Sequence, residues 1–374
     1  MLEVETQSQH LKNLEKKIGL AIFQQEEVLF WRAWKVKLFL ELKHCLMRIK
    51  LFYKTILILL IFGLLGGCNS NGSNAYVPES SGNINALTVV MPQALWSKSL
   101  GTDVRNILME PYEGLPFDEP KYDLYHLDPS IFTGFARSGR NIVFFKKDTS
   151  NQGFRLIKNL WARPQIAGLI TGEDEEVMKF YFDENKDLLL RSINENERLE
   201  KIRRMSKALN KDKELADRFG ISMTFPDAYK TVKDTTNFVW IEKEVYKGHL
   251  NIITYTLPLD IDLKKIEERI PAIRDSIGKI YVPGRVPGSY MITERAYLPY
   301  YYKTSVNNLE ALLTKGTWEV QNDFMAGPYV NYIIKDTLNK RNIVIEGFSF
   351  APSESKRDYM FELNTIITTL KLVN

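Results

Sequence analysis

The chain beyond residue 86 opens with short apolar runs and one stretch of helical spacing. Residues 87–91 are apolar and β-branched and are followed by Pro92, so they predict a buried strand. Apolar side chains then recur every four positions from Trp96 to Leu108, which is the spacing of an amphipathic helix. Three further apolar runs predict strands at residues 122–127, 141–146 and 165–170.

A long helix is predicted to close this first half. Acidic residues at 173–176 suit the positive end of a helix dipole, and basic residues crowd positions 201–207 at the other end. Residues 210–217 are then strongly charged, which is typical of a solvated connection. We therefore predict a domain boundary near residue 215.

The second half has the pattern of an antiparallel sheet. The sequence Lys247-Gly248 is a hairpin signal between two runs that suit strands. Five strands are predicted, at residues 238–245, 250–257, 316–321, 329–335 and 342–350. An earlier strand is expected at residues 221–225, directly after the boundary.

Helices complete the second half and define the fold class. Asp260 or Asp262 is expected to cap a helix toward Ile277, and Ser353 to cap a last helix that reaches Leu370. Each half then runs from strands to a closing helix. We predict an α+β protein with two α/β sandwich-like halves, 87–215 and 216–374, each with a mostly antiparallel sheet and a closing C-terminal helix.

An export signal precedes this region. Residues 47–67 combine a basic start, an apolar run of about ten residues and the pair Gly66-Gly67, directly before Cys68. The apolar run is roughly half as long as a permanent transmembrane helix requires. We predict cleavage between Gly67 and Cys68 and lipidation of the Cys68 thiol, in the manner of a bacterial lipoprotein.

The lipid anchor predicts a location in the cell envelope. Each buried acyl methylene contributes about 0.8 kcal/mol, and two chains give a durable tether to the membrane. Residues 68–86 are rich in Asn, Ser and Gly, which predicts a flexible linker. Asn69 stands where Asp would signal inner-membrane retention, and no acidic run follows it. We therefore predict the periplasmic face of the outer membrane.

Residues 1–46, ahead of the signal, have two interpretations. Met47 is well placed to start translation, so we predict that residues 1–46 are an upstream mis-start. The alternative is a cytosolic extension in which residues 11–42, with Trp31 and Trp34 among Lys and Glu, form an amphipathic membrane-surface helix.

Charge and cysteine content narrow the range of partners. The whole chain has 50 Lys and Arg against 46 Asp and Glu; residues 1–67 hold 10 and 6 of these, which leaves 40 of each from Cys68 onward. With a net charge of zero, this part of the chain lacks the excess of Lys and Arg that binds a phosphate backbone, so we expect no nucleic-acid partner. Cys45 precedes the signal and Cys68 is predicted to be acylated, so no disulfide is expected in the exported part.

No motif for catalysis or for a cofactor stands out. His126 and His249 are isolated, and neither is accompanied by a nucleophile elbow or a Gly-rich oxyanion loop. The acidic run 173–176 lacks the residue order of a calcium loop, and residues 284–288 lack the lysine of a phosphate loop. We expect neither a metal nor a cofactor and assign no catalytic residue.

Six short motifs are spread across the exported part of the chain. They are Leu-Pro-Phe-Asp-Glu-Pro at 115–120, Gly-Arg-Asn-Ile at 139–142, Trp-Ala-Arg-Pro-Gln at 161–165, Pro-Gly at 283–284 with Gly-Ser-Tyr-Met at 288–291, Met-Ala-Gly-Pro at 325–328, and Glu-Gly-Phe at 346–348 continuing to Lys-Arg-Asp-Tyr at 356–359. Together they resemble the domain-of-unknown-function family 4837, lipoproteins of Bacteroidota. Phe117 and Ala326 depart from that family's pattern. The resemblance implies a lipoprotein with a two-part α+β ectodomain and assigns no site residue.

A surface rich in tyrosine is predicted in the second half. Four tyrosines fall within six positions, and one strand face cannot bury them all because alternate residues point to opposite sides. The nearby loop 283–290 carries Arg285 on a Pro-Gly turn. We predict a partner-binding surface of Arg285, Tyr290, Tyr297, Tyr300, Tyr301 and Tyr302. The alternative is that the tether or the other half covers these rings.

Two classes of function remain open. We favour a non-catalytic binding or envelope-assembly lipoprotein, with an envelope protein or cell-wall glycan as its partner in addition to the membrane. The alternative is a periplasmic hydrolase of cell-wall glycan or peptide that uses two of the carboxylates Glu294, Glu319 and Glu346. Glycosidase carboxylates lie about 5 to 10 Å apart, so a structure can test that alternative.

Replacing Cys68 by Ser should abolish lipidation and the cleavage that depends on it, because a hydroxyl is a far poorer nucleophile than a thiolate. Metabolic labelling with an alkyne analogue of palmitate measures this directly, with the unsubstituted chain as the control. Label on the Cys68→Ser variant would show that another residue carries the lipid.

Overall fold

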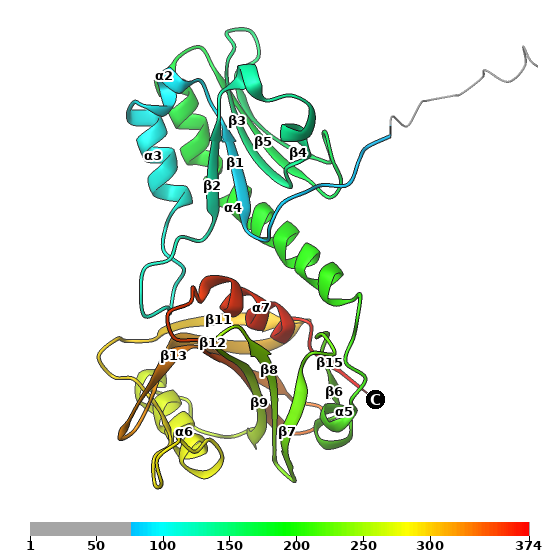
Figure 1. The fold of residues 1–374 in the computed structure, drawn as a ribbon, viewed down its shortest axis with the longest axis vertical. Coiled ribbons are helices and arrows are strands. Elements are labelled where there is room, and N and C mark those ends of the chain that lie inside the picture. The colour runs from blue at the N-terminus through cyan, green and yellow to red at the C-terminus, as the bar shows by residue number, and fades with distance from the viewer. Residues whose placement is uncertain (1–75, 374) are drawn as a thin grey trace, which may run out of the picture. The chain divides into compact units, whose positions relative to one another are not determined.

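Two β-sheets organise the part of the chain that the structure describes, residues 76–373 of the computed structural model (Figure 1). The chain from Tyr76 onward forms one compact unit. The predictions for residues 1–46, for the signal 47–67 and for lipidation at Cys68 lie outside the described residues. None of the helices within 76–373 is long and apolar enough to cross a membrane.

The first sheet has five strands in the order β2-β1-β3-β5-β4. They are β1 (Ala86–Val90), β2 (Asp123–Leu127), β3 (Asn141–Lys147), β4 (Gly153–Lys158) and β5 (Ile166–Gly172). The helices α2 (Gln93–Trp96), α3 (Ser99–Leu108) and α4 (Glu175–Met205) lie on one face, where Leu100, Val104 and Phe182 pack against Leu87 and Val89 (Figure 1). The opposite face is covered by a segment with the 3₁₀ turns η1 (Pro129–Ile131) and η2 (Gly134–Ser138).

This sheet corrects one detail of the prediction, because it is not mostly antiparallel. Its pairings β1·β2, β1·β3 and β3·β5 are parallel, and only β4·β5 is antiparallel. The helices α2 and α3 carry the chain back across one face between β1 and β2, and such a crossover returns the next strand in parallel. Strand β4 was not predicted, because it lies at the sheet edge and none of its residues is fully buried.

Helix α4 confirms the prediction made from its charges. Asp174 caps it by accepting a hydrogen bond from the Val177 amide at 2.9 Å. Glu175 and Glu176 lie in its first turn, and Arg203 and Arg204 in its last, which favours both ends of the dipole. At 31 residues it is long enough to pack on the first sheet and also to contact α7 (Arg357–Ile367) of the second half.

The second sheet has eight strands, in the order β10-β12-β13-β14-β9-β8-β7 with β11 also paired to β12. They are β7 (Lys230–Thr235), β8 (Phe238–Val245), β9 (Gly248–Pro258), β10 (Met291–Thr293), β11 (Tyr300–Val306), β12 (Leu309–Val320), β13 (Asp323–Asp336) and β14 (Arg341–Phe350). All its pairings are antiparallel, and the overall α+β class is confirmed. Helices α7 and α6 (Ile266–Tyr281) pack on opposite faces (Figure 1).

Several local predictions for this half need correction. The strand expected at 221–225 is only β6 (Ile221–Ser222), which pairs with β15 (Lys371–Leu372). The domain boundary near residue 215 stays a prediction; Leu215 itself lies in α5 (Glu214–Phe219) and packs with Phe219 into the core of the second sheet. Ser353 does not cap the last helix, because α7 begins only at Arg357. The hairpin at Lys247 is confirmed, with the positive φ of 56° that its tight turn requires.

A buried carboxylate, that of Glu362, connects α7 to α4 and β8. Glu362 accepts hydrogen bonds from Lys201 of α4 and Lys243 of β8, each at 2.6 Å, and from the hydroxyl of Tyr229 at 2.9 Å. Burial raises the pKa of Glu362, but the two lysines outweigh it and hold that pKa below its usual value. Glu362 therefore stays ionised where it joins three elements.

Glu362→Gln should lower the free energy of unfolding by about 3 kcal/mol at pH 7, because it leaves two partly buried ammonium groups without a counter-charge. Since the native pKa of Glu362 is depressed, this stabilisation is present above 4.5 and is lost as pH falls toward the lower native value. Urea unfolding at several pH values measures it.

The matched control is Glu310→Gln, which removes a carboxylate from the exposed pair with Lys335. That pair should contribute less than about 1 kcal/mol. Equal losses in both variants, or a loss at Glu362 that does not shrink in acid, would contradict the assigned role.

Candidate ligand-binding site

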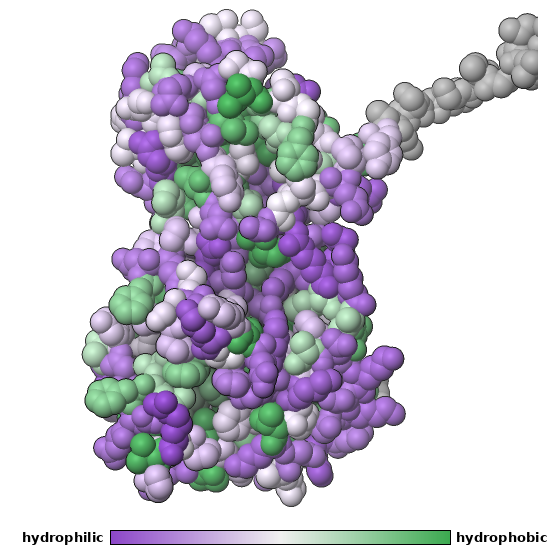
Figure 2. Space-filling view, viewed as in Figure 1, coloured by the Kyte–Doolittle hydropathy of each residue, from purple (hydrophilic) through white to green (hydrophobic). Residues whose placement is uncertain are grey.

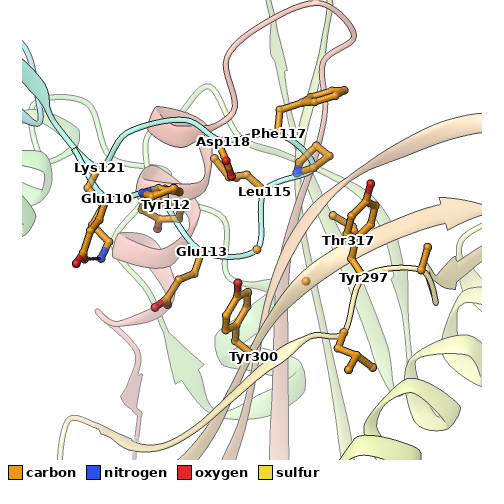
Figure 3. A pocket seen from close by; sticks show the side chains of 16 residues that line it. Glu110, Tyr112, Glu113, Leu115, Phe117, Asp118, Lys121, Tyr297, Tyr300 and Thr317 are labelled. Carbon is orange, nitrogen blue, oxygen red and sulfur yellow. Dashed lines mark hydrogen bonds and ion pairs between the residues drawn. The ribbon is translucent and has the colours of Figure 1, made fainter. Parts of the chain in front are cut away.

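A cavity of about 870 Å³ lies between two walls of the described part of the chain. One wall is the loop of residues 110–121, which connects α3 to β2. The other wall consists of residues 296–300 before and at the start of β11, with Gly316 and Thr317 of β12. Figure 3 shows Phe117, Tyr297 and Tyr300 around this space.

The loop is fixed at its far end by the start of α7. The two carboxylate oxygens of Glu119 accept hydrogen bonds from the backbone amides of Lys356 and Arg357, each at 2.8 Å. These are amides at a helix N-terminus, which have no partner within the helix and favour a negative charge. In return, the Arg357 guanidinium donates to both oxygens of Asp123, at 2.9 and 3.1 Å, and to the Pro120 carbonyl at 3.2 Å.

The near end of the loop lies directly against β12. Gly114 has a positive φ of 81°, and a Cβ at this position would come within 2.9 Å of the Lys315 side chain, so glycine is required. Glu113 pairs with the Lys315 ammonium at 3.0 Å, and that ammonium also lies 5.5 Å from the Tyr112 ring and 5.6 Å from the Tyr302 ring. Burial raises the pKa of Glu113, but Lys315 outweighs it and the pKa is lowered.

Large apolar side chains are left exposed around the cavity. Phe117 is 77% exposed, Tyr297 63% and Leu298 86%. On the face seen in Figure 2, apolar residues form separate patches within a mostly polar surface. Exposed rings gathered at one cavity on a fixed loop are typical of an interaction site.

Only some residues of the predicted tyrosine surface line the cavity in the structure. Tyr297 and Tyr300 line the cavity, and Tyr302 lies beside Lys315 on the exposed side of β11. Tyr301 points the other way and is half-buried against the core of the second sheet, where desolvation raises its pKa. Arg285 and Tyr290 do not line the cavity. Arg285 reaches Asp323 at 2.9 Å, and Tyr290 forms a β-bridge with Pro283.

The three carboxylates considered for a hydrolase do not line this cavity either. Glu346 is 1% exposed and accepts two hydrogen bonds from Arg274 at 2.6 and 2.7 Å and one from Asn331, so it is part of a buried structural network. Glu294 accepts from the Ala296 amide and the Thr317 hydroxyl, which fixes the backbone beside the cavity. Glu319 lies on β12 opposite Ile292.

The histidines and acidic groups offer no metal centre within residues 76–373. His126 stacks on Trp96 with ring centroids 4.4 Å apart, and its Nε2 bonds the Met91 carbonyl at 2.8 Å. His249 lies beside Glu242 at 3.2 Å. Over the described residues, His, Cys, Asp and Glu side chains nowhere gather in a set that could hold a metal ion.

Sequence reasoning missed the loop as a wall of the site. In the sequence analysis, residues 115–120 stand out only as one of the six motifs of the family resemblance. Phe117 is a large apolar residue in a turn segment with prolines at 116 and 120, and this position could have indicated an exposed aromatic side chain. The role of Glu119 had no local signal, since its partners lie 237 and 238 residues further along the chain.

The comparison with protein families assigns the second half. Residues 208–369 match the family described as Domain of unknown function (DUF4837). This match supports the resemblance to that family seen in the sequence motifs. Residues 80–206 match a different family, Domain of unknown function (DUF8532). The motifs at 115–120, 139–142 and 161–165 therefore fall in the DUF8532 segment, and the Glu119 contact joins the two segments.

Other comparisons are less informative. No curated protein matches the chain. One solved structure with a match is the "Crystal structure of LpqN involved in cell envelope biogenesis of Mycobacterium tuberculosis". The identity is 13%, the match covers 41% of this chain and 83% of that one, and the TM-score is 0.26, too low to support any argument.

Glu119→Ala should release the loop from α7. We expect a loss of about 1 kcal/mol in the free energy of unfolding, the usual effect of removing a helix-capping side chain. Amide hydrogen exchange in residues 112–120 should rise more than exchange in the two sheets. Glu110→Ala is the control, because its pair with Lys121 is exposed. Unchanged exchange in the loop would mean that Glu119 does not hold it.

Proposed function

We propose that the chain is a lipid-anchored binding protein of the bacterial cell envelope, and that its ligand occupies the cavity between residues 110–121 and 296–300. The observation that carries this proposal is the exposure of Phe117, Tyr297 and Leu298 around that cavity. Aromatic rings contribute much of the energy at binding sites, because they bury a large rigid surface at a low cost in entropy.

The charges of the cavity support binding over hydrolysis. Its carboxylates are Glu110, Glu113 and Asp118. Glu110 pairs with Lys121 at 3.0 Å and Glu113 pairs with Lys315 at 3.0 Å. A hydrolase that uses two carboxylates needs one as an acid and one as a base or nucleophile. Lys315 lowers the pKa of Glu113, which disfavours Glu113 as the acid.

The anchor supplies the location in this proposal. Lipidation at Cys68, followed by a linker rich in Asn, Ser and Gly, would hold the folded part on the periplasmic face of the outer membrane. An envelope protein or a cell-wall glycan is the partner within reach. Exposed aromatic rings beside hydroxyl and carboxylate groups suit the binding of a protein or of a glycan.

Replacing Tyr297 and Tyr300 together by Ala should reduce partner recovery at least tenfold, because each removes an exposed ring from the cavity. Recovery is measured by crosslinking in the intact envelope and by co-sedimentation with purified cell-wall sacculi. The melting temperature should stay within about 2 °C, since exposed side chains contribute little to stability.

The control removes two exposed tyrosines that do not line the cavity, Tyr125 and Tyr246. It should recover the partner as the unsubstituted chain does. Equal recovery by all three proteins, or equal losses in both double variants, would refute the proposed site.

A further inference from the structure

A second cavity, of about 400 Å³, lies on the other side of Tyr112 and Glu113. Its walls come from α4, from the start of the 110–121 loop, from Lys315 of β12 and from α7. We propose that this cavity binds the phosphate group of a small phosphate ester, with Arg191 as the main anchor. The ligand and the cavity differ from those of the proposed function.

The charge of the lining favours an anion. Four cationic side chains, Lys121, Arg191, Arg198 and Lys315, face two carboxylates, Glu113 and Glu195. The aromatic cavity on the other side has the opposite balance, with three carboxylates and one lysine. A phosphate ester carries a charge of about −1.5 to −2 at neutral pH and is therefore favoured in the second cavity and disfavoured in the first.

Arg191 is the cation that remains free to bind it. Glu195 accepts two hydrogen bonds from Arg198, at 2.8 and 2.7 Å, and Glu113 and Glu110 engage Lys315 and Lys121. Within residues 76–373 no carboxylate pairs with Arg191, which is exposed on α4. A guanidinium presents a planar fork of donors that matches two oxygens of a phosphate.

Two amide groups add further donors. The Oδ1 of Asn194 accepts a hydrogen bond from the Tyr122 hydroxyl at 2.6 Å, and the Oδ1 of Asn364 accepts one from the Tyr332 hydroxyl at 2.8 Å. These bonds identify the oxygen of each amide side chain, so the other terminal atom of each is the NH₂ nitrogen. Both side chains line the cavity, and in the described part of the chain neither NH₂ group has an acceptor, so each remains a free donor for the ligand.

The size of the cavity indicates that the phosphate is attached to an organic group. Ligand cavities commonly measure about 300 to 1,000 Å³, far more than one phosphate requires. Phe361 and the Tyr112 ring supply apolar surface beside the donors. Buried Thr365 also lines this cavity, and its hydroxyl lacks a hydrogen-bond partner within residues 76–373. A sugar phosphate and the glycerophosphate of a lipid headgroup share this chemistry.

Calorimetric titration of the purified full-length protein tests the proposal. Glycerol 3-phosphate should bind saturably, and glycerol, which lacks the phosphate, should not. Arg191→Gln and Arg191→Glu should each weaken binding at least tenfold without changing the melting temperature. Arg155→Glu, a charge reversal at an exposed arginine on β4 that lines neither cavity, should leave the affinity within twofold.

A second arm identifies the source of the phosphate. Vesicles of phosphatidylcholine with and without phosphatidic acid are mixed with the full-length protein and its Arg191→Glu variant. Binding to phosphatidic acid that depends on Arg191 supports a lipid headgroup, and binding of glycerol 3-phosphate alone supports a soluble ester. Absence of binding in both arms, or binding that Arg191→Glu leaves unchanged, overturns the proposal. Tyr297→Ala should not alter the titration, so failure here and failure of the aromatic site are distinguishable.

Discussion

The contact between Glu119 and the start of α7 is the constraint on which both cavities depend. The 110–121 loop contains no helix and no extended strand, only an isolated β-bridge between Pro111 and Pro120, yet it forms a wall of each cavity. Two charge-assisted contacts hold its far end, Glu119 on the α7 amides and Arg357 on Asp123, and the ion pair of Glu113 with Lys315 holds its near end. Glu119 accepts hydrogen bonds from amides that have no partner within the helix. Moving the loop would therefore remove those hydrogen bonds from α7 and also a wall from each cavity.

Buried carboxylates bridge elements in the same way elsewhere in the described residues. Glu197 on α4 binds Arg140 at 2.6 Å and the Asn85 amide at 2.6 Å, which joins the start of β1 to the start of β3. Glu346 binds Arg274, whose guanidinium lies 3.4 Å from the Tyr329 ring centroid. Burying such charges carries a desolvation cost, so removing one partner of either pair should be strongly destabilising, because the other charge would stay buried without a counter-charge.

The sequence predicted elements whose residues carry a strong local pattern. The charges of α4 and the apolar runs of β1, β9 and β14 located those elements within a few residues. The edge strands β4 and β7 were missed because only half of their residues face a core, and the parallel pairing of the first sheet depends on contacts distant in sequence. At the site, strand alternation correctly implied that some tyrosines are exposed, but it could not place the 110–121 loop opposite them.

The ion pair of Glu113 with Lys315 separates two cavities of opposite charge. Glu113 lines both of them, and Lys315 belongs to the basic one. An anion beside Lys315 would compete with Glu113 for the ammonium, and the Glu113 carboxylate would then carry an unbalanced charge toward the aromatic cavity. Occupancy of either cavity would therefore change the electrostatic free energy of a ligand in the other, and such a linkage would act equally in both directions.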